Sequence, residues 1–153
     1  MKMADFNHGG CSIIAPVLDA ADYPSPYPLG RNRVILEKGL PAEGCGLLAG
    51  RAMVVMEVHP VANSLKSETA FRMDPKEQVR LLLDFEKRGL DLTGIFHSHP
   101  HGPSFPSAID VRQASYPGVI QLICWPDGMD WKCRAYRIPA AGEPDEIDVK
   151  RVE

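Results

Sequence analysis

The segment Leu92–Asp110, LTGIFHSHPHGPSFPSAID, joins an apolar run to a loop rich in Pro and Gly and then to a capped helix. Residues 92–99 predict a strand and residues 100–106 a loop, because Pro and Gly interrupt regular structure. Ser107 can cap a helix that runs to about residue 115. Side chains alternate between the two faces of a strand, so His97 and His99 point the same way. The segment therefore predicts two converging imidazoles where a strand enters a loop.

Such a histidine pair can bind Zn²⁺, and Asp110 is the candidate third ligand. A catalytic zinc takes three protein ligands and keeps one position open. Asp110 lies one turn inside the predicted helix, so the loop can fold its carboxylate back over the strand end. Each residue also has an ordinary explanation, since paired histidines often only pack and Asp110 can complete a capping box with Ser107. The residues alone leave both interpretations open.

The rest of the chain predicts strands interleaved with helices. Residues 45–49 and 52–59 form a predicted strand pair, and residues 119–125 and 131–138 flank a Pro-Asp-Gly turn, which is typical of a hairpin. Asp74 can cap a helix that begins at Pro75 and ends at Gly89, whereas residues 29–40 are a weaker helix candidate. These elements predict a layered α/β or α+β domain.

Composition limits the possible partners. The chain has 153 residues, of which 44% are hydrophobic and 24% charged, and this fits one domain with a buried core. Its 17 Lys and Arg and 20 Asp and Glu give a net charge of −3, so we expect neither nucleic acid nor an anionic membrane surface as a partner. No stretch resembles a membrane helix or an export signal, and the cytoplasm is the expected compartment.

The four cysteines do not form a recognisable framework. They are Cys11, Cys45, Cys124 and Cys133, and no two of them make a C-x-x-C pair. This spacing favours scattered reduced thiols over disulfides or a four-cysteine zinc site, although the even number leaves disulfides open.

A longer pattern connects these residues to a known family. Glu43 lies within PAEGCGLLAG (residues 41–50), His97-Ser98-His99-Pro100 follows, and then come Ser107 and Asp110. This order closely resembles the JAMM motif of the MPN+ (JAB/MPN) metallopeptidases over roughly residues 30–138. The resemblance implies a three-layer α/β fold, with a mixed sheet flanked by helices as in cytidine deaminases. It also implies zinc held by His97, His99 and Asp110, with Glu43 as the acid/base and Ser107 stabilising the tetrahedral intermediate.

The resemblance also implies a substrate class. Small stand-alone prokaryotic members hydrolyse a peptide or isopeptide bond after the C-terminal Gly-Gly of a ubiquitin-like or sulfur-carrier protein of the ThiS/MoaD type. Two alternatives stay open: a non-catalytic MPN-type interaction module and a zinc-dependent small-molecule amidase. Cytidine deamination is disfavoured, because the chain lacks the C-x-x-C that those enzymes require. The oligomeric state is not predicted.

The expected organisation has three parts. Residues 1–28 are expected to be a poorly structured leader, because Pro residues alternate near its end. Residues 29–140 are expected to form the JAB/MPN catalytic domain. Residues 141–153 are expected to be an acidic, solvated tail.

Overall fold

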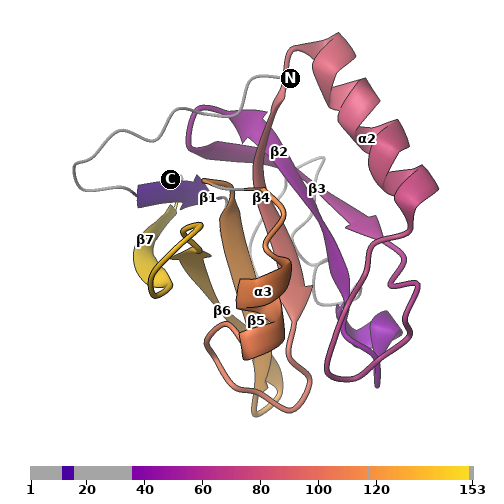
Figure 1. Cartoon of the computed structure of the whole chain (residues 1–153), viewed down its shortest axis with the longest axis vertical. Coiled ribbons are helices and arrows are strands. Elements are labelled where there is room, and N and C mark those ends of the chain that lie inside the picture. The colour runs from indigo at the N-terminus through magenta and orange to yellow at the C-terminus, as the bar shows by residue number, and fades with distance from the viewer. Residues whose placement is uncertain (1–11, 16–35, 117, 152–153) are drawn as a thin grey trace.

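The computed structural model describes residues 12–15, 36–116 and 118–151. In chain order, the named elements are β1 (Ser12–Ala15), β2 (Cys45–Arg51), β3 (Val54–Val61), α2 (Pro75–Arg88), β4 (Asp91–Ser98), α3 (Ala108–Gln113), β5 (Ile120–Asp127), β6 (Asp130–Arg137) and β7 (Asp145–Arg151). The strands described form one closed sheet in the order β1-β3-β2-β4-β5-β6-β7 (Figure 1). No helix within the described residues is both long enough and apolar enough to cross a membrane.

The predicted α/β class with a mixed sheet flanked by helices is confirmed. The pairs β4–β5, β1–β3 and β1–β7 are parallel, whereas β2 pairs antiparallel with both β3 and β4. Closure of the sheet into a barrel was not predicted. It depends on β1, which joins β3 to β7 and so removes both open edges.

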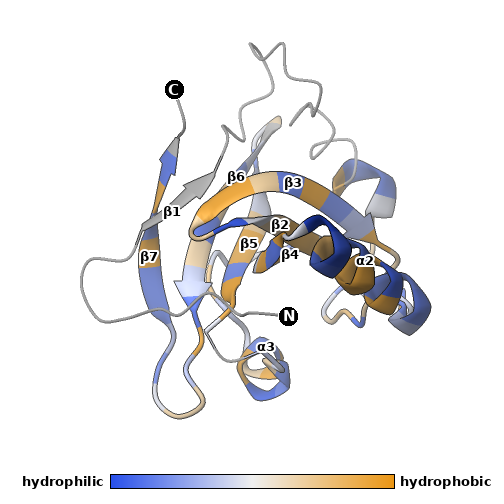
Figure 2. Ribbon diagram, turned by 90° about the horizontal axis from the view of Figure 1, so that it is seen from above, coloured by the Kyte–Doolittle hydropathy of each residue, from blue (hydrophilic) through white to orange (hydrophobic). Residues whose placement is uncertain are grey.

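Helix α2 has the boundaries that the sequence predicts. The Asp74 side chain accepts the N–H groups of Lys76 and Glu77, and Gly89 ends the helix at a φ of 66°, a conformation that Gly adopts without steric cost. Leu81 and Phe85 are buried against the sheet, and polar residues cover much of the opposite side (Figure 2). Because of this amphipathic pattern, α2 lies along β3 and β4.

Two apolar clusters occupy the two faces of the sheet. One lies beneath α2 and includes Leu47, Ile95 and Phe85, and the other includes Leu48 and Phe96 from the alternate positions of the same strands. Gly46 lets β2 approach its neighbours closely, since a Cβ there would collide with the His59 carbonyl and the Phe96 ring. The packing thus fixes β2 directly beside the histidine-bearing β4.

The expected solvated tail is wrong for residues 145–151, which form β7. Ile147 is buried in a core cluster and pairs with Ala135 of β6. Glu146 and Asp148, on either side of Ile147, are exposed, so these two charged residues lie on the outer face of the strand and Ile147 on the inner face. Within the expected leader, Ser12–Ala15 form β1, and the other residues of 1–28 lie outside the described part of the chain. Residues 36–39 of the weaker helix candidate are helical.

The expectation of reduced thiols is wrong for Cys124 and Cys133, which form a disulfide. The β5–β6 hairpin places these two residues directly opposite each other, with their Cα atoms 4.1 Å apart. The hairpin was predicted, but its register was not, and the register decides which residues pair. Cys45 is a free, buried thiol, and Cys11 lies outside the described residues.

Candidate metal centre

The two histidines converge where β4 ends. His97 is the penultimate residue of β4, and His99 follows the strand directly. Their Nε2 atoms lie 3.1 Å apart, and both side chains are buried. The alternation expected of an extended strand therefore aims both rings at the same point.

Asp110 completes a three-residue group with these rings. Its Oδ1 lies 3.3 Å from His97 Nε2 and its Oδ2 lies 3.2 Å from His99 Nε2. The capping box is also present: the Ser107 N–H donates to Asp110 Oδ2 at 2.7 Å, and the Asp110 N–H donates to Ser107 Oγ at 3.2 Å. Asp110 can therefore complete the capping box and also face the two histidines as a candidate metal ligand, because a carboxylate offers several acceptor sites.

Glu43 borders the same centre from the segment that precedes β2, the strand paired with β4. It lies just before β2, is 3% exposed, and brings Oε1 to 4.0 Å from His99 Nε2. Burial raises the pKa of Glu43 to about 7, an effect that His99 opposes and Asp110 reinforces. A carboxylate that titrates near neutrality can take up and return a proton.

The pKa values of the three remaining residues of the centre also depart from normal. Burial lowers the pKa of His97. Burial acts in the same direction on His99, but hydrogen bonds to Asp110 and to the Pro103 carbonyl raise its pKa overall. For Asp110, burial is outweighed by hydrogen bonds to His97 and His99, which hold its pKa well below normal. A negative carboxylate thus lies between two ring nitrogens.

This donor set fits a metal ion. Glu43, His97 and His99 each offer a ligand atom, and these atoms all lie within 4.8 Å of one another. The Glu43 Oε2 atom is buried without a hydrogen-bond partner. His99 Nδ1 lies 2.7 Å from the Pro103 carbonyl, which fixes a hydrogen on Nδ1 and leaves Nε2 as the metal-binding nitrogen.

Not every residue near the motif enters the centre. His101 is exposed and its Nε2 lies 3.4 Å from Glu68, so it is a loop residue as expected. Phe71, for which the sequence predicts no contact with the centre, stacks on His97 with ring centroids 4.6 Å apart. Ser98 Oγ accepts the N–H of Gly44 at 2.7 Å. Contacts of this kind join distant segments and leave no signal in local spacing.

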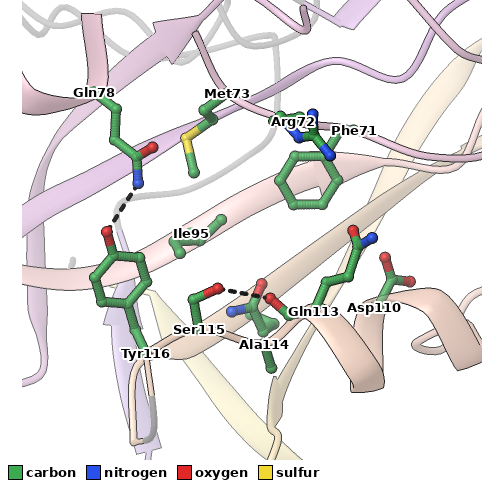
Figure 3. Close-up of a pocket in the computed structure, with 11 residues that line it drawn as sticks. Phe71, Arg72, Met73, Gln78, Ile95, Asp110, Gln113, Ala114, Ser115 and Tyr116 are labelled. Atoms are coloured by element: carbon green, nitrogen blue, oxygen red, sulfur yellow. Dashed lines mark hydrogen bonds between the residues drawn. The ribbon is translucent and has the colours of Figure 1, made fainter. Parts of the chain in front are cut away.

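A cavity of about 360 Å³ adjoins the centre between α2 and α3 (Figure 3). Phe71 and Asp110 line it together with Ile95, and Gln78 donates to the Tyr116 hydroxyl at 3.0 Å on its far side. The centre thus lies next to a space large enough for part of an extended chain.

The chain resembles known proteins over most of its length. Residues 30–138 match the family model described as prokaryotic homologs of the JAB domain. The chain belongs to this family. Among curated relatives of this JAB-domain protein, a desampylase of Haloferax volcanii is 46% identical over 91 residues, which cover 58% of this chain and 66% of the relative. This chain therefore spans just under two thirds of that relative.

Two further comparisons extend over more of the chain. A probable TtuB-protein conjugate cleaving protease of Thermus thermophilus is 38% identical over 116 residues, 75% of this chain and 74% of the relative. The solution structure of a protein from Desulfitobacterium hafniense superposes with a TM-score of 0.77 at 32% identity, covering 92% of this chain and 94% of that one. The resemblance to the JAB/MPN family that the motif indicated is thereby confirmed.

Proposed function

We propose that this protein is a zinc-dependent hydrolase that cleaves a peptide or isopeptide bond at the C-terminal Gly-Gly tail of a ubiquitin-like or sulfur-carrier protein. The observation that carries the proposal is that the Asp110 carboxylate lies 3.3 Å from His97 and 3.2 Å from His99. The buried Glu43 forms a group of possible ligands with the same two histidines. The names of the Haloferax and Thermus relatives, a desampylase and a conjugate-cleaving protease, support the substrate class.

In this proposal, His97, His99 and Asp110 hold zinc. Two imidazole nitrogens and a carboxylate are a ligand set found in catalytic zinc sites. When bound, zinc polarises a carbonyl group and lowers the pKa of a coordinated water toward 7. The Pro103 carbonyl keeps the His99 ring in the orientation that presents Nε2 to the centre.

Glu43 acts as the acid/base and Ser107 as a hydrogen-bond donor. The buried Glu43 carboxylate, which borders the centre, can accept a proton from the attacking water and pass it to the leaving amine. Ser107 Oγ accepts from the Asp110 N–H, and its own hydroxyl hydrogen stays available for the oxygen of the scissile carbonyl.

The test is cleavage of a carrier protein extended beyond its Gly-Gly tail, followed by intact-mass spectrometry. We expect zinc-loaded protein to release the extension at the bond after the second Gly. Chelator should stop the reaction, and added zinc should restore it. A carrier whose Gly-Gly is replaced by Pro-Pro is the matched control. Zinc-loaded protein that binds the carrier without cleaving it, or cleavage insensitive to chelator, would contradict the proposal.

A further inference from the structure

The backbone of Glu43 is held by a loop rather than by the sheet. Glu43 precedes β2, whose ladder pairs begin at Cys45. Its N–H donates to the Ser67 carbonyl at 2.8 Å, and its carbonyl accepts from Asn63 Nδ2 at 3.0 Å. Both partners belong to the segment Asn63–Arg72, which we call the 63–72 loop. The position of the Glu43 peptide therefore depends on the conformation of this loop.

The Asn63 side chain organises the loop from within. Its Nδ2 also donates to the Ala70 carbonyl at 3.1 Å, and its Oδ1 accepts the N–H groups of Leu65 and Arg72, each at 3.1 Å. An asparagine amide offers two donor hydrogens and two acceptor lone pairs. All four are used here, and only the bond to Glu43 leaves the loop.

The start of the loop is anchored to α2. The Ala62 carbonyl accepts the Asp74 N–H at 2.9 Å, and the Ala62 N–H donates to Glu77 Oε2 at 3.1 Å. Asn63 also forms an isolated bridge with Met73. The main chain next to Asn63 is therefore held by the N-terminal end of α2, and the Asn63 amide connects this anchored segment to Glu43.

The far end of the loop reaches the histidines. Phe71 lies between Ala70 and Arg72, the two residues bonded to the Asn63 amide, and its ring stacks on His97. Figure 3 shows Phe71 facing α3, the helix that carries Asp110. One side chain thus fixes the segment that contacts both Glu43 and a proposed zinc ligand.

We propose that Asn63 is a positioning residue for the acid/base: its amide sets the place of the Glu43 carboxylate relative to the metal centre. This inference rests on the proposed function. The role belongs to the NH2 group of the Asn63 side chain, which donates to the Glu43 carbonyl. The Oδ1 atom of the same side chain bonds only within the loop. Residues that orient the groups of a metal site commonly affect activity about 10- to 100-fold.

The experiment uses two substitutions of Asn63 and a matched control. Asn63→Asp keeps an acceptor for Leu65 and Arg72 but removes both donor hydrogens, and Asn63→Ala removes the amide without adding charge. Ser64→Ala is the control, since the Ser64 hydroxyl donates to the Arg72 carbonyl at 3.0 Å in the same loop without contacting Glu43. All are assayed as zinc-loaded full chains on the extended carrier.

We expect kcat to fall about 10- to 100-fold in both Asn63 variants, with KM within about threefold of the unsubstituted protein. Zinc content should remain one ion per chain, because the proposed ligands are unchanged. Ser64→Ala should stay within about twofold of the original kcat. The inference is overturned if the Asn63 variants match the control, if only KM changes, or if the loss of activity follows loss of zinc.

Amide hydrogen exchange tests the inference even if no carrier is cleaved. The Glu43 N–H should exchange at least about tenfold faster in both Asn63 variants than in the unsubstituted and Ser64→Ala proteins, since its bond to Ser67 depends on the loop. Equal exchange in all four proteins would overturn the inference. An inactive but zinc-loaded unsubstituted protein with the expected exchange pattern would instead remove the proposed function alone.

Discussion

Asp110 and Ser107 each serve both the helix and the site. The Asp110 carboxylate closes the capping box of α3 and lies within hydrogen-bond distance of both imidazoles. Ser107 is the N-cap and, in our proposal, the donor to the scissile carbonyl. Substitutions here change folding and chemistry together, so an informative variant must separate the two effects.

Ser107→Gly and Ser107→Ala make this separation. Gly at an N-cap costs only a few tenths of a kcal/mol, whereas Ala costs about 1 kcal/mol. Both variants lose the hydroxyl, and we expect kcat to fall about 100-fold in each, as after loss of an oxyanion donor. Steady-state kinetics and urea unfolding measure the two quantities. The donor role would be excluded if kcat fell only in proportion to the loss of stability, so that the kcat of Ser107→Gly stayed close to that of the unsubstituted protein.

The sequence predicts the residues of the candidate metal centre better than the residues that hold them in position. His97, His99, Asp110 and Glu43 follow from residue chemistry and a spaced motif, and the structure brings their side chains together. Asn63 and Phe71 could not be predicted this way. Their contacts cross between a loop and distant segments, so no periodicity or cap signal marks them.

At the scale of elements, an ion pair fastens α2 to β3. Arg88, in the last turn of α2, donates to Glu57 of β3 at 2.6 and 2.9 Å. These hydrogen bonds lower the pKa of Glu57 to about 2, against the opposing effect of partial burial and with a smaller contribution from His59. Since α2 anchors the start of the 63–72 loop, this contact supports the site indirectly.

Glu57→Gln should reveal this contact through its pH dependence. The folded-state pKa is lower than the usual 4.5, so the stabilisation is fully present above about pH 4.5 and is lost as pH falls toward 2. Because Arg88 is exposed and water screens the pair, we expect only a small loss in the free energy of unfolding at pH 7. Urea unfolding of both proteins at pH 7, 5 and 3 measures the difference.

The control is Glu143→Gln, which removes an exposed carboxylate elsewhere. Its effect on the free energy of unfolding should be close to zero at each pH. A difference between Glu57→Gln and the unsubstituted protein that stays constant from pH 7 to pH 3 would contradict the assignment of the stabilisation to the ionised pair.

Elements with strong end signals were predicted well, whereas β1 and β7, which lack such signals, were missed. Asp74, Pro75 and Gly89 mark the ends of α2, and the structure confirms all three. The β7 strand has a single buried apolar residue, Ile147, among charged residues, so its sequence looks like a solvated segment. The main chain of β7 pairs with β1 and β6, and this pairing stabilises a strand that the side-chain pattern does not indicate.

At the scale of the whole molecule, the Cys124–Cys133 disulfide joins neighbouring strands of the barrel next to the site. The Cys124 carbonyl accepts the His99 N–H at 2.8 Å, so the bridged strand directly supports a proposed ligand. Sequence spacing could not predict this bridge or the barrel closure, because both depend on pairing registers.

Reduction of this disulfide should destabilise the protein by about 2–3 kcal/mol, as expected for a closed loop of about ten residues. Guanidinium unfolding with and without reductant measures the change. Thiol titration in denaturant should find two fewer reactive thiols before reduction than after it. An equal thiol count in both conditions would show that the bridge does not form in solution.

Metal removal should also lower stability, because the proposed ligands join β4 to α3. A metal present at about 100 times its Kd adds about 2.7 kcal/mol, which corresponds to roughly 5–10 °C in Tm for a chain of this size. Thermal unfolding with and without chelator measures the shift. Unchanged Tm after complete metal removal would show that no ion connects these two elements.

The most direct test of the central claim is the cleavage rate of the extended carrier by unsubstituted and Glu43→Gln proteins carrying equal zinc. Gln has nearly the same shape as Glu but cannot accept and return a proton. We expect one zinc per chain in both proteins and a rate at least about 100-fold lower for Glu43→Gln. Equal rates at equal zinc content would contradict it.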